Sequence, residues 1–425
     1  MKTPTMTAFI TDGDERPALA VARSLARLGV SVIVGAPGPI SLASRSRACA
    51  RHVTYPSPHR HPEQFDRFLL DFVRREQVSV VMPVTEVTTY LVSRNRRVLL
   101  PHTAVAAPSF EAFDAVADKS LLVDRAIAAG VPVPRTEFVN GVTALRGVLN
   151  TLEYPVVVKP FRSRIRVTGG WVQTTVRYAR SESELVALYQ NIEYLARYPS
   201  MLQERIVGPG TGLFVLCDHG RIRAEFAHKR LREKPPSGGV SVLAESVPVD
   251  PRLRDQAERL LGPLGWHGVA MLEYKRDART NQPYLMEVNG RFWGSLQLAI
   301  DAGVDFPAIA YQLALGCPPG PRPAYRVGLK SRWLLGDLDH LLARLRRTDE
   351  HALPDGSPSR GQVVADFLKL AGRGLRYDVI RLRDPLPFFH ELRSYLAGAF
   401  AGAARQIHAA RTQEREVPTH VDALR

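Results

Sequence analysis

Two neighbouring apolar runs of the sequence each end on a glutamate. The runs Val269–Leu272 and Tyr284–Val288 are short enough for β-strands, and a polar, turn-rich segment separates them. Glu273 closes the first run and Glu287 closes the second. If the two strands pair as a hairpin, both carboxylates can share one face of it, because side chains alternate between the faces of a strand.

Asn289 and Arg291 follow Glu287 at alternate positions, so an extended chain directs all three to that same face. Two carboxylates and an amide oxygen are hard ligands, which suit Mg²⁺ bound together with substrate phosphates. The guanidinium would stabilise charge on a transferred phosphoryl group. For either glutamate taken alone, a solvated strand end is the alternative interpretation.

This stretch resembles the metal-binding end of the ATP-grasp superfamily. The family signature is an acid that ends one strand, followed by an E-x-N-x-R run, and Glu273, Glu287, Asn289 and Arg291 match it residue by residue. The resemblance implies that the two glutamates and the asparagine bind Mg²⁺ (or Mn²⁺) on ATP. It also implies that Arg291 contacts the γ-phosphate or the acyl phosphate made from it.

Lysine is scarce in this arginine-rich chain, which makes each internal lysine a candidate for a specific role. Lys119 follows Asp118 in a predicted helical connection and resembles the family's first lysine, which contacts the α-phosphate. A solvated helix face is the alternative. Lys159 ends the strand Tyr154–Pro160, where a buried ammonium needs a partner. It matches the family's V-V-x-K-P lysine, which contacts the α- and β-phosphates.

The loop after Lys159 contains Gly169 and Gly170, which permit close backbone approach to a ligand. In the family this loop is a flexible flap over the phosphates, so the resemblance implies that both glycines bind the nucleotide. The arginines of the loop either contact phosphates or an anionic second substrate, or they belong to a plain solvated β-hairpin. These arginines are Arg162, Arg164 and Arg166.

The run Met201–Val207 resembles the hinge strand on which adenine rests. The resemblance implies that Glu204 accepts from or orients the adenine amino group, and that the backbone near Ile206 reads the ring edge. Where the family has a second acid for the ribose, this chain has Gly210 and Thr211, so the ribose contact is unassigned.

His228, Arg230 and Arg232 alternate along the next predicted strand, which would place them on one face. They form either an anion site for the substrate carboxylate and transferred phosphate or an ordinary exposed strand. In the first interpretation Arg230 is catalytic, and His228 is a polar positioner or a proton carrier.

Residues 6–100 alternate between short apolar runs and segments of helical spacing, which predicts a parallel α/β unit. The glycines do not form a G-x-G-x-x-G pattern after the first strand, which argues against dinucleotide binding. Asp12, Glu15 and Glu86 lie at or near predicted strand ends, where such folds bind ligands. Each of these acids is a candidate for contact with substrate, with helix caps or solvated loops as the alternative.

The formal net charge of +15 does not by itself indicate nucleic-acid binding, because the arginines are spread along the chain without a recognisable binding motif. No apolar run approaches the roughly 18 residues that span a bilayer, and the N-terminus has no signal-peptide pattern. Three widely spaced cysteines indicate neither a metal site nor a disulfide framework. We expect a cytoplasmic protein without a nucleic-acid partner or a transmembrane segment.

The predicted fold class is α/β, with an α+β ATP-grasp part. A Rossmann-like domain over residues 1–108 is expected to precede a two-lobed ATP-grasp domain, divided into 109–202 with the flap and 203–320 with the metal site. A mainly helical, basic extension over 321–425 is expected to follow and to be disordered after about residue 410. This extension either packs on the core or offers a surface to an acidic membrane or a partner protein.

The resemblance implies an ATP-dependent carboxylate–amine (or –thiol) ligase that forms ADP and phosphate. Its partners would be a small carboxylic or amino acid, a nucleophilic co-substrate and, as an open alternative, a second copy of the chain in a homodimer. One rival is a carboxylase-type subunit that activates bicarbonate, although no biotin site of the A-M-K-M kind occurs. Another is a scaffold that binds ATP without turnover, which the complete metal end argues against.

Overall fold

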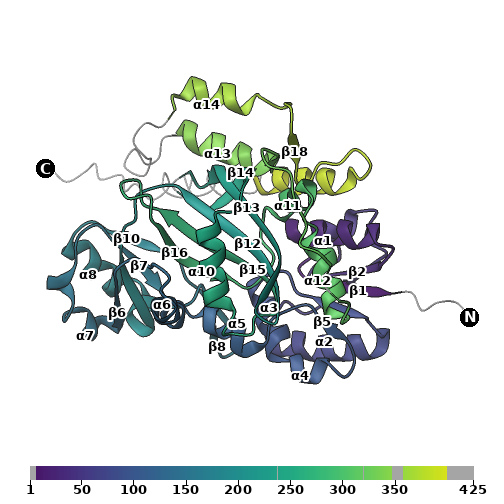
Figure 1. The fold of residues 1–425 in the computed structure, drawn as a ribbon, viewed down its shortest axis with the longest axis horizontal. Coiled ribbons are helices and arrows are strands. Elements are labelled where there is room, and N and C mark those ends of the chain that lie inside the picture. The colour runs from purple at the N-terminus through teal and green to yellow at the C-terminus, as the bar shows by residue number, and fades with distance from the viewer. Residues whose placement is uncertain (1–5, 237, 319, 347–357, 400–425) are drawn as a thin grey trace, which may run out of the picture.

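The computed structural model describes residues 6–236, 238–318, 320–346 and 358–399. Within them the strands form sheets of five, four, seven and two strands. Figure 1 shows the five-stranded and four-stranded sheets on opposite sides of the large seven-stranded sheet. None of the helices in these ranges is long and apolar enough to cross a membrane.

The N-terminal domain is a parallel sheet in the order β3-β2-β1-β4-β5, as the alternating pattern predicted. Its strands are β1 (Thr7–Ile10), β2 (Ser31–Ala36), β3 (Arg51–Thr54), β4 (Val80–Met82) and β5 (Ala104–Val105). Its helices are α1 (Arg16–Arg27), α2 (Pro62–Glu76), α3 (Glu86–Arg94) and α4 (Arg96–Leu99), with a 3-10 turn at Ala43–Arg45. The carboxyl ends of β1 and β4 are adjacent, so the loops after them can form one site.

The next part contains a four-stranded antiparallel sheet in the order β10-β7-β11-β6 and the separate hairpin β8-β9. The strands are β6 (Thr136–Asn140), β7 (Val156–Pro160), β8 (Arg164–Val167), β9 (Gly170–Gln173), β10 (Arg177–Ala179) and β11 (Pro199–Glu204). The helices are α5 (Phe110–Ala117), α6 (Lys119–Ala128), α7 (Gly141–Leu145), α8 (Glu182–Asn191) and α9 (Glu193–Arg197), with a 3-10 turn at Leu149–Thr151.

The seven-stranded sheet has the order β16-β15-β12-β13-β14-β17-β18. Its first five strands are β12 (Gly210–Asp218), β13 (Arg221–Lys234), β14 (Val240–Val247), β15 (Gly268–Arg276) and β16 (Pro283–Asn289). Helix α10 (Pro251–Leu261) packs with α5 and α6 on one face, and α11 (Leu296–Ala302) and α12 (Phe306–Ala314) pack on the other. Alternate residues of β12 face opposite sides of the sheet: Leu213 packs in the hydrophobic cluster with α10, and Phe214 packs in the cluster with α11 and α12.

The extension after residue 320 contributes strands as well as the predicted helices. Its elements are β17 (Lys330–Arg332), α13 (Leu334–Arg346), α14 (Arg360–Phe367), β18 (Leu375–Tyr377) and a helix over 386–399. Strands β17 and β18 continue the seven-stranded sheet beyond β14, which confirms that the extension packs on the core. The predicted disorder after residue 410 lies outside the described residues. The domain boundaries remain a prediction, although this sheet crosses the one at residue 320.

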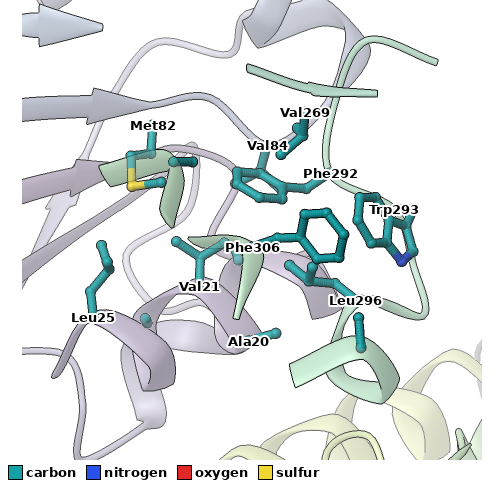
Figure 2. Close-up of a cluster of buried hydrophobic side chains, with 14 of the residues drawn as sticks. Ala20, Val21, Leu25, Met82, Val84, Val269, Phe292, Trp293, Leu296 and Phe306 are labelled. Atoms are coloured by element: carbon teal, nitrogen blue, oxygen red, sulfur yellow. The ribbon is translucent and has the colours of Figure 1, made fainter. Parts of the chain in front are cut away.

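A shared hydrophobic core fixes the N-terminal domain against the seven-stranded sheet. Figure 2 shows Val21 of α1 and Val84, just after β4, in one cluster with Phe292, Trp293 and Phe306. These five side chains are at most 1% exposed, and burial of each large apolar side chain stabilises the fold by about 1.5–3 kcal/mol. Because Phe292 and Trp293 directly follow Arg291, this core also fixes the position of the predicted metal end.

Candidate active site

The predicted hairpin brings the two glutamates together. Strands β15 and β16 pair antiparallel with Glu273 opposite Glu287 and Met271 opposite Asn289. The amide of Asn289 donates to Glu287 Oε1 at 2.8 Å and to Glu273 Oε1 at 3.3 Å. The carboxyl side chains are 25% and 32% exposed, so they line an accessible surface rather than the core. Rotation of the Asn289 amide would turn its oxygen toward the space between the two carboxylates. The three side chains would then offer the oxygen ligands that Mg²⁺ prefers.

Arg230 orients one of these carboxylates. Its guanidinium donates to Glu273 Oε2 at 2.6 Å and to Glu233 Oε1 at 2.9 Å. Burial raises the pKa of Glu273, and Glu287 raises it further, while Arg230 lowers it. A partly desolvated carboxyl with a like charge beside it is a site that a bound cation relieves. The structure therefore brings Arg230 to the metal end, but as a partner of a proposed metal ligand.

Both candidate lysines face the metal end from the neighbouring part of the chain. Lys119, at the start of α6, places Nζ 3.0 Å from Ser163 Oγ and 3.5 Å from Glu287 Oε2. Lys159 on β7 has only Met286 Sδ, at 4.0 Å, as a hydrogen-bond partner within the described residues. Burial lowers the pKa of Lys159 to about 8, against the opposing effect of Glu287. A phosphate group would supply the charge-assisted partner that a thioether cannot.

Arg291 lies beside these groups at the end of β16. Its guanidinium donates to its neighbour's carbonyl, Phe292 O, at 2.8 Å and approaches Asn289 Oδ1 at 3.5 Å. Five side chains predicted from two distant sequence segments therefore meet at one place: Lys119, Glu273, Glu287, Asn289 and Arg291.

His228 is buried instead of facing the ligand side of this cluster. Its Nε2 lies 2.8 Å from Ser295 Oγ, and its ring packs 4.6 Å from the ring of Phe214. Burial and the charge of Arg230 lower the pKa of His228 to about 3, so the imidazole is neutral at ordinary pH. Of the two roles predicted for His228, the geometry favours the polar positioner over the proton carrier, because an imidazole with a pKa this low does not take up a proton at neutral pH.

Arg232 does not share the face of Arg230, so that part of the alternating pattern was wrong. The register between β13 and β14 shifts between these two residues, as at a β-bulge. A bulge adds one residue to one strand and reverses the direction of the following side chains. Arg232 consequently pairs with the buried Asp337 of α13 at 2.8 Å.

A cavity of about 600 Å³ adjoins the metal end. Arg291 lines it together with Glu15 from the loop after β1, Glu86 at the start of α3 and Glu391 from the helix over 386–399. Asp12, the third predicted acid, points into the N-terminal domain, where its carboxylate accepts hydrogen bonds from the Thr11 hydroxyl and the Thr85 amide. The size suits a small-molecule substrate.

Known proteins share this fold. A family model described as ATP-grasp in the biosynthetic pathway with Ter operon matches residues 197–335. N5-carboxyaminoimidazole synthetase from Staphylococcus aureus superimposes with a TM-score of 0.61 at 15% identity, covering 83% of this chain and 87% of that chain. Residues 197–335 thus match an ATP-grasp family, and most of the chain has the fold of the synthetase.

Two further ATP-grasp relatives extend the comparison. The carbamoyl phosphate synthase large chain of Thermotoga neapolitana is 22% identical over 365 residues, which are 78% of this chain and 32% of that protein. The chain thus spans about a third of the length of this relative. The biotin carboxylase domain of Hydrogenobacter thermophilus 2-oxoglutarate carboxylase is a dimer in complex with MgADP, ADP and bicarbonate. It gives a TM-score of 0.61 at 16% identity, over 77% of this chain and 74% of that chain.

The β8–β9 hairpin follows Lys159, where the ATP-grasp resemblance implies a flap, with Gly169 in its turn and Gly170 at the start of β9. Gly169 has a φ of +80°, which an L side chain rarely adopts. A Cβ on Gly170 would lie 3.3 Å from the carbonyl oxygen of His59, and Trp171 donates to Pro58 O at 3.1 Å. In this conformation the flap rests on the N-terminal domain, and its nucleotide contacts remain a proposal.

The arginines of the flap are already engaged in ion pairs or line the cavity. Arg162 pairs with Asp114 at 2.8 Å and with Asp118 at 3.4 Å, which ties the base of the flap to α5 and α6. Arg166 pairs with Glu63 of the N-terminal domain. Arg164 lines the cavity, so it alone of the three is directed to the expected anionic substrate.

Strand β11 ends at Glu204, within the run Met201–Val207 for which the ATP-grasp resemblance implies a hinge. Glu204 Oε1 accepts from the backbone N–H of Arg135 at 3.2 Å, and Ile206 is 6% exposed. One carboxylate oxygen is therefore used to fix the segment, and the adenine contacts of Glu204 and Ile206 remain proposals.

Sequence reasoning missed the residues that the C-terminal extension adds to the cavity, which are Trp333, His390, Glu391 and Ser394. No motif marks them, and they follow Arg291 by at least about 40 positions. Only the packing of the extension on the core brings them to the site.

Proposed function

We propose that this chain is an ATP-dependent, ADP-forming ligase that activates a small carboxylic or amino acid as an acyl phosphate and joins it to an amine or a thiol. The observation that carries the proposal is the meeting of lysines and paired carboxylates. Lys119 Nζ lies 3.5 Å from Glu287 Oε2, and Asn289 bridges Glu287 and Glu273. Triphosphate and divalent cation together match this set of charges.

In the proposed reaction, an oxygen of the substrate carboxylate attacks the γ-phosphorus of ATP. The bond from that phosphorus to the bridging oxygen breaks, and ADP leaves. The amine or thiol then attacks the carbonyl carbon, loses a proton and expels phosphate. Lys119 and Lys159 hold the ATP phosphates, and Arg291 stabilises negative charge on the acyl group as the nucleophile adds.

Glu273, Glu287 and Asn289 would hold Mg²⁺, which supplies charge neutralisation on the phosphates when bound. Arg230 keeps the Glu273 carboxylate turned toward the metal end through their hydrogen bond at 2.6 Å. The buried His228 fixes Ser295, at the start of α11, just beyond the metal-end sequence. Mn²⁺ has the same oxygen-ligand preference and is an alternative ion.

A bicarbonate-activating carboxylase is the second candidate, because one of the similar structures is a biotin carboxylase domain in complex with bicarbonate. In that reaction bicarbonate takes the place of the carboxylic acid. A scaffold that binds ATP without turnover is not favoured, since all four metal-end residues are present.

ATP turnover in the presence of Mg²⁺ tests the proposal. The full chain is assayed with a panel of amino acids, small carboxylic acids and bicarbonate, each with and without amines and thiols, and ADP, AMP and phosphate are measured. ADP and phosphate released only with a particular acid and nucleophile establish the ligase. AMP and pyrophosphate as products would contradict an acyl phosphate, and ADP release with bicarbonate alone would favour the carboxylase.

A further inference from the structure

The charged residues that line the cavity beside Arg291 indicate what kind of substrate it binds. Arg291 gives it a cationic end at the metal site, and Arg164 of the flap lines it as well. An anionic substrate group at this end would lie next to the groups proposed to hold the γ-phosphate. This is the place where a carboxylate must lie to be phosphorylated.

Four carboxylates, here called the acidic wall, also line the cavity, together with Arg16, His59 and His390. Asp14 and Glu15 come from the loop after β1, Glu86 begins α3, and Glu391 comes from the helix over 386–399. Burial raises the pKa of Glu15, and Asp12 raises it further, while Arg16 and Arg291 lower it. Glu15 is therefore close enough to Arg291 to sense its charge, so both signs of charge occur within one small cavity.

The nearby cation on α1, Arg16, acts on Glu15 and Glu391 but forms its ion pair with a carboxylate outside the cavity lining. Arg16 donates to Asp378 Oδ2 at 2.5 Å, and its guanidinium lies 3.9 Å from the ring centre of Trp333. Its charge is thus matched by a carboxylate on the far side of the cavity wall. An ammonium group of the substrate would complement these acids, because charge-assisted hydrogen bonds form between oppositely charged partners.

The helix over 386–399 is fixed as one wall of this cavity. Trp333 Nε1 donates to Glu391 Oε1 at 2.8 Å, which directs this carboxyl group. Asp384, just before the helix, accepts from Arg23 Nε at 2.8 Å and from Ser46 Oγ at 2.6 Å on the N-terminal domain. The extension is therefore part of the substrate site as well as of the fold.

We propose that the acid activated at this site is a free amino acid. Its carboxylate faces Arg291, its ammonium group is bound by Glu15 and Glu86, and Glu391 at the opposite wall selects among side chains. The assignment rests on the proposed ligase function. An ammonium group gives Glu15 and Glu86 a charge-assisted partner that a simple carboxylic acid lacks, and bicarbonate would fill only a small part of a cavity of about 600 Å³.

Calorimetric titration of the full chain tests the assignment independently of turnover. The protein is saturated with Mg²⁺ and a non-hydrolysable ATP analogue, and the probes are the twenty common amino acids, their N-acetyl derivatives and unsubstituted carboxylic acids of equal length. We expect at least one free amino acid to bind at least tenfold more tightly than its N-acetyl derivative. Equal affinity for the two, or no binding by any free amino acid, overturns the assignment.

Neutral variants of the acidic wall test the residues. Glu15→Gln and Glu86→Gln should each weaken binding of the free amino acid about tenfold or more, since each loses a charge-assisted hydrogen bond, and should leave the affinity for the ATP analogue unchanged. Glu258→Gln, an exposed glutamate of α10, is the matched control and should bind as the native chain does. Native affinity for the amino acid in both cavity variants overturns the role given to these residues.

Turnover then separates this inference from the proposed function. An amino acid that binds through Glu15 and Glu86 but supports no ADP release supports the binding assignment and contradicts the ligase. If a simple carboxylic acid supports ADP release, and the Glu86→Gln variant releases ADP at the same rate, the ligase function is supported. The assignment of a free amino acid as the substrate is then overturned.

Discussion

At the scale of single residues, the site shifts the pKa values of two neighbouring glutamates, Glu273 and Glu287, in opposite directions. Burial acts to raise the pKa of both carboxyl groups. For Glu287 the opposing effects of Lys119, the Asn289 hydrogen bond and Lys159 prevail and lower the pKa, while for Glu273 burial prevails. Glu287 is thus the ionised carboxylate at the centre of the proposed metal site.

Glu287→Gln should therefore reduce ATP turnover at least about 100-fold. Loss of a residue that only supports a metal ligand typically costs about 10–100-fold, and loss of a ligand itself should cost at least the upper end of that range. The change removes one charge and almost no volume from a side chain that is 32% exposed, so the melting temperature should change little. Turnover and circular dichroism on the same preparation check this. Native turnover would refute the metal assignment.

Lys159 predicts the pH dependence of nucleotide binding. Its pKa falls from 10.5 to about 8 by burial, and Glu287, Lys119, Lys275 and Glu273 are the other charged groups that act on it. The free protein loses this proton as the pH rises through about 8, so affinity for MgATP should then decrease by up to tenfold per pH unit.

A series of MgATP titrations between pH 7 and 9.5 measures this decrease. Lys159→Arg is the control, because a guanidinium keeps its charge throughout this range and should flatten the profile. An equally flat profile in the native chain would contradict the role of Lys159.

At the scale of elements, a buried ion-pair cluster joins α13 to the seven-stranded sheet. Asp337 of α13 accepts from Arg332 of β17 at 2.6 Å and pairs with Arg232 of β13 at 2.8 Å. Arg332 also donates to Phe367 O of α14 at 2.7 Å. The bulge that removes Arg232 from the active site thus supplies a structural contact for the extension.

Asp337→Ala should destabilise the fold by about 3–5 kcal/mol, because it leaves buried guanidinium groups without their carboxylate. Asp337 and Arg332 have fully buried side chains, whereas Glu193 and Arg197 form an exposed pair at 3.0 Å. Glu193→Ala is therefore the control and should cost far less. Urea unfolding of both variants gives the comparison, and similar small losses would refute the anchoring role of Asp337.

At the scale of the whole molecule, the extension is integral to the fold. It supplies two strands to the central sheet and partners to buried arginines of α1, with Asp378 on Arg16 and Asp384 on Arg23. It also supplies part of the wall of the cavity beside Arg291. Sheet, ion pairs and cavity therefore depend on one segment.

Truncation after residue 324 should accordingly give a chain that is poorly soluble, unfolds without a cooperative transition and lacks turnover. The truncation exposes the edge of β14 and leaves Arg16 and Arg23 without their carboxylates. Expression, solubility and thermal unfolding are compared with the full chain. Equal solubility and melting temperature would contradict an integral role.

The sequence by itself determined the local chemistry of this protein. Alternation placed Glu273, Glu287 and Asn289 on one face, since a two-residue period is a property of any strand. Apolar runs and helical spacing were enough to predict the parallel N-terminal sheet, which the structure confirms. Strand pairing over a short turn is local as well, so the two apolar runs were enough to predict the β15–β16 hairpin, although not the register shift between Glu273 and Tyr274.

The tertiary structure alone decided how distant segments meet. A bulge in β13 separated Arg232 from Arg230, and no residue pattern announces a register shift of this kind. Burial set the charge of His228, because desolvation depends on neighbours from Phe214 to Ser295 that lie elsewhere in the chain. The acidic wall with Glu391 arose for the same reason: long-range packing, which local sequence does not encode, brings the extension to the cavity.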